Sequence, residues 1–177
     1  MILPKGLRAG PAELMIVAGS ALFIFVLWLS AYLEPDIRWL HFFQAWMYIV
    51  AAWLSLRGNR WGYFIGFSAA GLWDYINLFV TTFLVSGLHW LAVSIGAGTL
   101  QRIDQLVAIP GWIGNFMVIV GAILGYCRLT DKQLLDAGRL ILAFALSTTF
   151  FGTVIFFCQP RYVPLFRALL HSHWPSY

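Results

Sequence analysis

The stretch GLWDYIN, residues 71–77, places a carboxylate near the middle of an apolar run that extends from Trp61 to Leu88. An ionised aspartate at the centre of a membrane helix costs about 3 kcal/mol on insertion scales. A residue that is so costly in hydrocarbon usually faces the interior of the protein and has a polar partner or a function there. We therefore interpret the rest of the chain as helices that pack around Asp74.

The amino-acid composition is that of a membrane protein. Of the 177 residues, 61% are hydrophobic and 10% are charged, whereas a soluble domain usually carries about 25% charged residues. A chain this apolar cannot cover itself with a polar surface, so lipid must be its main solvent. The length suits a single membrane domain, residues 1–177. The net charge of +4 comes from Lys and Arg residues scattered singly between apolar runs, which favours a role in membrane topology and excludes nucleic-acid binding.

Five apolar segments are long enough to cross a bilayer core of about 30 Å. The predicted spans are residues 14–33, 37–56, 61–86, 111–129 and 139–158. Turn-forming or charged residues separate the spans, and a helix satisfies its own backbone hydrogen bonds, as hydrocarbon requires. No good cleavage site follows the first span, so we expect it to be retained. The predicted fold class is all-α: a polytopic integral membrane protein with a five-helix transmembrane bundle.

Two segments lie outside these spans. Residues 99–109 carry apolar side chains on one side and polar ones elsewhere, which predicts a short interfacial helix between the third and fourth spans. A re-entrant segment made of residues 89–109 is the alternative. The tail, residues 161–177, mixes aromatic and basic residues, and we expect it to lie along the lipid headgroups.

The basic residues predict how the chain is oriented. Five spans would place one group of them on the side of the N-terminus: Lys5, Arg8, Arg57, Arg60, Arg128, Lys132 and Arg139. The smaller group would lie on the opposite side: Arg38, Arg102, Arg161 and Arg167. Because cytoplasmic loops are enriched in Lys and Arg, we expect the N-terminus in the cytoplasm and the C-terminus outside, across a plasma (inner) membrane.

Polar residues recur on one face of the second and third spans. At about 100° per residue, Asp74 and Asn77 share one stripe, and His41, Gln44 and Tyr48 share another. The two spans are joined by a short turn, so they should be antiparallel neighbours whose stripes meet. We therefore expect these five residues to form a polar cluster in the outer half of the membrane, which is the candidate ligand-binding site.

Several interpretations of Asp74 stay open. In a structural role, its carboxyl, charged or protonated, bonds to Gln44, Tyr48 or Asn77 and pins two helices together. In a functional role, it accepts a proton or binds a cation in an outward-opening cavity. A contact with another subunit is a third role.

The sequence carries no recognised catalytic or metal-binding motif. All the histidines fall on the predicted outer side: His41, His89, His171 and His173. Together with Asp36 or Asp104 they have the donor types of a metal site, but their spacing matches no established zinc or copper motif. Cys127 and Cys158 fall at opposite ends of their spans, which is too far apart for a disulfide. We predict no metal and no catalytic residue, and the sequence names no cofactor.

Glycines line one side of the fourth span: Gly111, Gly114, Gly121 and Gly125. Small residues let helix backbones approach closely, so that dispersion forces hold the helices together in lipid. This side either packs against another helix of the same chain or meets another membrane subunit.

Two functional hypotheses follow. The first is a small protein that binds or transports an apolar or cationic molecule at the polar cluster around Asp74, although no inverted repeat and no broken helix of the transporter kind is evident. The alternative is a non-catalytic membrane subunit or assembly factor of a larger membrane complex. An enzyme that uses His41 with Asp74 or Asn77 for acid–base chemistry is a third hypothesis, which the sequence favours least because nothing marks a nucleophile.

Overall fold

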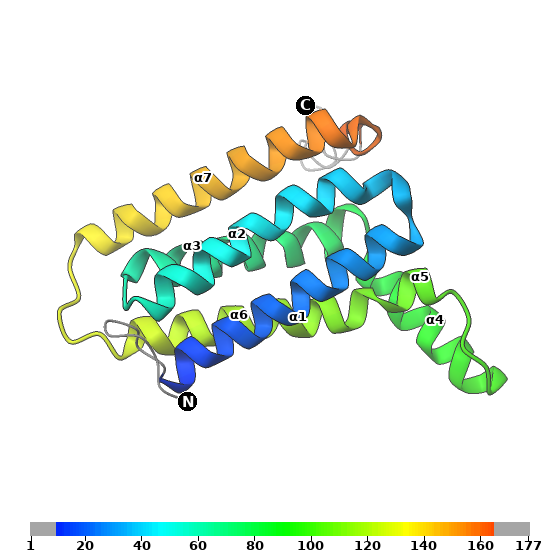
Figure 1. The fold of residues 1–177 in the computed structure, drawn as a ribbon, viewed down its shortest axis with the longest axis horizontal. Helices are drawn as coiled ribbons and strands as arrows, with labels where there is room; N and C mark the ends of the chain where they lie inside the picture. Colours follow the sequence, from blue (N-terminus) through cyan, green and yellow to red (C-terminus); the bar gives the residue numbers. More distant parts are fainter. Residues whose placement is uncertain (1–9, 165–177) are drawn as a thin grey trace, which may run out of the picture.

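The computed structural model describes residues 10–164, and every regular element in that part of the chain is a helix (Figure 1). The long helices are α1 (Pro11–Leu33), α2 (Arg38–Leu56), α3 (Arg60–Tyr75), α6 (Ala108–Cys127) and α7 (Leu135–Cys158). The remaining elements are η1 (Pro35–Ile37), the π-helical segment η2 (Ile76–Val80), α4 (Phe83–Ala97), α5 (Ile103–Leu106) and η3 (Pro160–Tyr162). The predicted all-α class is confirmed.

Three helical segments in the described part of the chain are long and apolar enough to cross a membrane. They are α1, the stretch Ile103–Cys127 that contains α5 and α6, and α7. The segment Arg60–Val80 and α4 pass the same test together, as a pair bent by 67° that counts as one span at most. This pattern is compatible with an integral membrane protein. The predicted tail reaches beyond the described part, because residues 165–177 lie outside it.

The third predicted span, residues 61–86, is interrupted in the structure. α3 passes into η2, and the Thr81 amide then donates to the Ile76 carbonyl oxygen at 2.9 Å, a spacing of five residues. Thr82 follows with a φ of 52°, in the left-handed region that β-branched residues rarely adopt. α4 starts at the next residue in a new direction. The prediction of one continuous helix over residues 61–86 was therefore wrong. The break was not predicted because neither proline nor glycine marks it and the apolar pattern continues through it.

The predicted interfacial helix, residues 99–109, also differs from the structure. Only the four residues of α5 are helical there before α6 begins at Ala108. Gly98 caps the C-terminal end of α4 with a φ of 67°, which suits a glycine. The Gln101 amide then donates to Ser94 Oγ at 2.9 Å. α4 and α5 thus form a hairpin that extends beyond the end of the other helices (Figure 1).

The glycine side of α6 packs against helices of the same chain. α1 and α6 lie side by side (Figure 1), and a Cβ added to Gly19 would be 2.5 Å from the Gly114 carbonyl oxygen. A Cβ on Gly121 would be 2.8 Å from the Ala12 oxygen. Gly111 faces α1 as well, and Gly125 faces the ring of Tyr63 on α3. Because this side of α6 is covered, a partner subunit would have to use a different surface.

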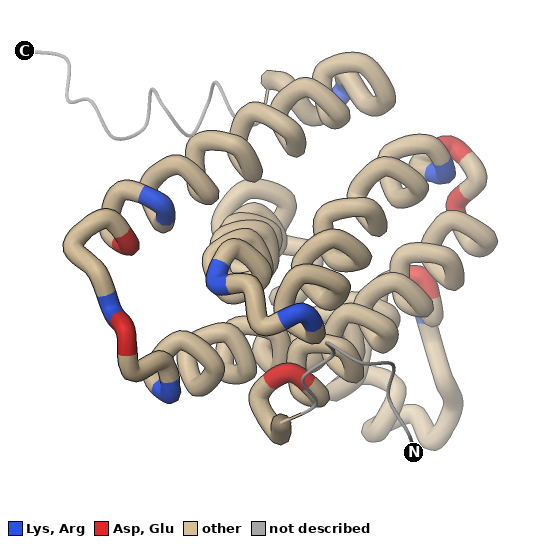
Figure 2. Tube along the Cα trace, turned by 60° about the vertical axis from the view of Figure 1, so that its left-hand side comes forward, with Lys and Arg blue, Asp and Glu red and all other residues tan. Residues whose placement is uncertain are grey.

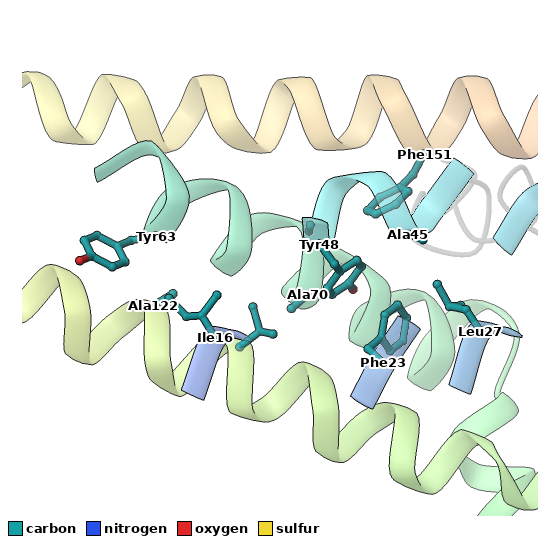
Figure 3. Packing of buried hydrophobic residues seen from close by; sticks show 11 residues of the cluster. Ile16, Phe23, Leu27, Ala45, Tyr48, Tyr63, Ala70, Ala122 and Phe151 are labelled. Carbon is teal, nitrogen blue, oxygen red and sulfur yellow. The ribbon is translucent and has the colours of Figure 1, made fainter. Parts of the chain in front are cut away.

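The hydrophobic core lies where α1, α2, α3, α6 and α7 meet (Figure 3). Tyr48 is completely buried, and its ring centroid is 4.4 Å from that of Phe23 on α1. Ile16, Val118 and Phe151 are also buried in this cluster. A fully buried Tyr needs a hydrogen-bond partner for its hydroxyl group, and the partner of Tyr48 is a residue of the candidate site.

Charged residues gather toward the helix ends and are sparse between them (Figure 2). At one end, Arg60 forms ion pairs with Asp131 at 2.5 Å and with Asp136 at 2.9 Å, and Arg139 contacts Asp136 at 2.6 Å. At the other end, Arg161 forms an ion pair with Glu34 at 2.8 Å. These pairs join the α6–α7 loop and the first turn of α7 to the start of α3, and η3 to the C-cap of α1.

Candidate functional site

Asp74 on α3 is buried, with 9% of its surface exposed, and Asn115 on α6 holds it. The Asn115 side-chain amide donates from Nδ2 to Asp74 Oδ1 at 2.9 Å. The Tyr48 hydroxyl on α2 donates to Asn115 Oδ1 at 2.8 Å. A chain of hydrogen bonds therefore runs from α2 through α6 to α3. Sequence reasoning missed Asn115, although a single amide in the apolar fourth span was a usable signal.

A cavity of about 100 Å³ lies beside Asp74. His41 on α2 and Asn77 in η2 line this cavity together with Asp74, so the structure brings three of the predicted site residues to one space. Tyr48 does not line the cavity and reaches Asp74 only through Asn115. Much of the remaining wall is aromatic: Phe23, Trp73, Phe83, Trp112 and Tyr162.

Gln44 is not part of the hydrogen-bonded chain. It is 1% exposed, and neither atom of its side-chain amide has a hydrogen-bond partner among the described residues. The expectation that Gln44 contacts Asp74 assumed that only the second and third spans meet at the site. In the structure α6 also packs there, and Asn115 contacts the Asp74 carboxyl instead.

The polar side chains of the cavity wall direct their donor groups toward the backbone. His41 Nδ1 lies 2.9 Å from the Leu27 carbonyl oxygen, which can only accept, so Nδ1 donates and the neutral ring keeps Nε2 as an acceptor. Asn77 Nδ2 donates to the Trp73 oxygen at 3.0 Å. This leaves Asn77 Oδ1 as an acceptor. In the same way, Thr81 Oγ1 donates to the Ile76 oxygen at 3.3 Å.

The Asp74 carboxyl adds to this group of acceptors. Within residues 10–164, its hydrogen bond from Asn115 is the only one, and it engages Oδ1, which leaves Oδ2 without a donor. Glu34 also lines the cavity, and its Oε1 is engaged by Arg161. Ser30 contributes a hydroxyl group, which can donate as well as accept. Trp73, Trp112 and Tyr162 in the wall also carry N–H or O–H groups, but none of these donates to Asp74, His41 or Asn77 among the described residues.

The structure gives no support to a metal site in the part of the chain it describes. No group of three or more His, Cys, Asp and Glu residues there is placed to hold a metal ion. His171 and His173, which belong to the histidine pattern, lie outside the described residues. Cys127 and Cys158 are both free thiols.

Comparisons with known proteins do not assign this chain to a family. No family model matches the sequence, and no curated protein or solved structure is significantly similar to it.

Proposed function

We propose that this chain is a multi-pass membrane protein that binds a small organic cation, such as a primary ammonium ion, in the cavity beside Asp74. In this proposal α1, α2, α3 with η2, α6 and α7 all cross the bilayer. The N-terminus is cytoplasmic, and the cavity lies in the outer half of a plasma membrane. Transport of the bound cation is the further step that this arrangement allows.

The lengths of the helices support five crossings. α2 has 19 residues, which at about 1.5 Å per residue gives a length close to the bilayer core. α3 and η2 together form a continuous helical rod of similar length before the bend. The ion pair between Arg60 and Asp131 requires that the α2–α3 turn and the α6–α7 loop lie at the same end, as five crossings demand.

The observation that carries the proposal is a set of three hydrogen-bond acceptors on the cavity wall that receive no hydrogen bond from the described residues. Asp74 Oδ2, His41 Nε2 and Asn77 Oδ1 can all accept, and none of the three receives a hydrogen bond from another described residue. A ligand that brings N–H donors and a positive charge satisfies these acceptors, whereas an anion would meet the lone pairs of all three. The aromatic residues of the wall favour a cation further, because the face of an aromatic ring attracts positive charge.

The break between α3 and α4 lies at the same place. Thr81 and Phe83, on either side of the left-handed Thr82, both line the cavity. Discontinuous helices form the substrate sites of many secondary transporters, where the helix ends and the unwound backbone contact the ligand. The interrupted helix therefore supports transport, a feature that the sequence alone did not suggest.

The proposal is tested by ligand binding to the purified protein in detergent. Propylammonium is the probe, and 1-propanol and propionate are its neutral and anionic controls of similar size. Trp73 and Trp112 line the cavity, so binding should change tryptophan fluorescence. We expect propylammonium to bind, and Asp74→Asn to weaken it at least about tenfold, equivalent to 1.4 kcal/mol.

Asp104→Asn is the matched control, because it removes a carboxylate on α5 that pairs with Arg102 and does not line the cavity. This variant should bind propylammonium as tightly as the unaltered protein does. Equal affinity of the Asp74→Asn variant, measured on protein with an unchanged melting temperature, would contradict the proposal. A preference for propionate would contradict it as well.

A non-catalytic subunit of a membrane complex is the second candidate, and the α4–α5 hairpin favours it. The hairpin extends beyond the other helices (Figure 1) and exposes large apolar side chains, including Leu88 at 52%, Ile95 at 73% and Leu100 at 73%. Stable co-purification of a partner protein that is lost when Leu88 and Ile95 are changed to Ser would support this candidate.

A further inference from the structure

A second hollow, of about 400 Å³, lies on the surface of the α1–α2 pair. Trp28 and Tyr32 from α1 and Phe42 from α2 line it, and they are exposed at 63%, 81% and 47%. The buried residues Ala31 and His41 complete this side of its lining. We call this hollow the α1–α2 groove.

Of the described residues that line the groove, only Arg38, at the start of α2, is charged. It is exposed, and among residues 10–164 it has neither an ion pair nor a hydrogen bond through its side chain. Arg102 and Arg161, by contrast, each hold a carboxylate at 2.8 Å. The guanidinium group of Arg38 is thus a permanent positive charge that is free to bind a ligand.

We propose that the α1–α2 groove binds one anionic phospholipid, whose phosphate contacts Arg38 and whose upper acyl chain packs against Trp28 and Phe42. Charge complementarity determines the headgroup, because guanidinium donors match phosphate oxygens in geometry and charge. The aromatic walls indicate that the ligand is a lipid, because Trp and Tyr side chains favour the level of the headgroups in a bilayer.

The groove and the cavity beside Asp74 select opposite charges. His41 lines both of them, but the cavity presents acceptors and the groove presents a cation. A small organic cation should therefore avoid the groove, and an anionic lipid should avoid the cavity. The lipid site consequently does not depend on the function proposed above.

Native mass spectrometry of the detergent-purified protein tests the proposal. The protein is mixed with equal amounts of phosphatidylglycerol and phosphatidylcholine that have identical acyl chains. We expect a single tightly bound phosphatidylglycerol, favoured about fivefold or more, as one basic residue near a headgroup provides. Arg38→Gln should abolish this preference, and Arg38→Lys should keep most of it.

Arg57→Gln is the matched control, because Arg57 is an exposed arginine at the opposite end of α2 whose guanidinium packs on Trp53. This variant should retain the preference for phosphatidylglycerol. Inorganic phosphate should not displace the lipid, because it lacks the acyl chain that the aromatic residues contact. An unchanged preference in Arg38→Gln would overturn the proposal, and so would displacement by inorganic phosphate.

Discussion

Asn115 and Asp74 meet across the interface of α6 and α3, with Nδ2 of the amide 2.9 Å from Oδ1 of the carboxyl. The Tyr48 hydroxyl donates to the other end of the same amide, at 2.8 Å. The Asp74 contact fixes which end of Asn115 faces the carboxyl, because a carboxylate oxygen accepts and only Nδ2 of the amide can donate to it. Oδ1 then faces the Tyr48 hydroxyl, which donates to it. Three helices are thus joined by two hydrogen bonds that share one side chain.

Replacing Asn115 should destabilise the fold. Asn115→Leu leaves both the Tyr48 hydroxyl and Asp74 Oδ1 without a partner in a buried site, and we expect the free energy of unfolding to fall by about 1–3 kcal/mol. Tyr48→Phe should cost about 1 kcal/mol, because it leaves only the Asn115 oxygen unpaired. Unfolding by SDS in mixed micelles measures both changes.

The double variant tests whether the two bonds act together. Once Asn115 is Leu, the hydroxyl of Tyr48 has lost its acceptor. Adding Tyr48→Phe removes this unpaired hydroxyl, so the double variant should have a higher free energy of unfolding than Asn115→Leu alone. Strictly additive costs would show that the Tyr48–Asn115–Asp74 chain does not exist as described.

The close contact of α1 and α6 should not tolerate an added methyl group. Gly19→Ala would bring a Cβ to 2.5 Å from the Gly114 oxygen, and backbone atoms cannot move aside as a flexible side chain can. We expect overpacking to lower the free energy of unfolding by about 1–3 kcal/mol. Unfolding in mixed micelles, as for Asn115, is the measurement.

Gly71→Ala provides the control for helix propensity. Gly71 lies within α3, and a Cβ there would meet nothing within 4 Å. Alanine is the better helix former by up to about 1 kcal/mol, so this variant should be as stable as the unaltered protein or more so. If both substitutions had the same effect, the close approach at Gly19 would be refuted.

The sequence predicted the all-helical class, because it consists of runs of apolar residues bounded by turn-forming or charged residues, although the predicted helix over residues 61–86 is broken in the structure. It also placed Asp74, His41 and Asn77 near one another, since the spacing of polar residues along a helix determines which side they share. The cavity brings these three side chains together.

The sequence could not show which helix supplies the partner of a polar residue. Helix order along the chain suggested a pairing of the second and third spans, whereas Asn115 comes from α6, 41 positions after Asp74. The break at Thr82 was also hidden, because its neighbours keep the apolar pattern of a helix. Both features depend on packing between distant segments, which a local pattern does not encode.

The left-handed conformation of Thr82 leads to the last prediction. Its φ of 52° and ψ of 23° crowd the Cβ against the backbone, which costs roughly 1–2 kcal/mol for an L-residue other than glycine. Thr82→Gly removes this strain but adds flexibility to the unfolded chain, so we expect the stability to stay the same or rise by up to about 1 kcal/mol.

Thr81→Gly is the matched control, because Thr81 has a φ of −91° and its hydroxyl bonds to the Ile76 oxygen. That variant should lose about 1 kcal/mol or more, because glycine weakens a helical position and the hydrogen bond is lost. Equal losses in the two variants, measured by unfolding in mixed micelles, would mean that the bend between α3 and α4 does not depend on a left-handed residue at position 82.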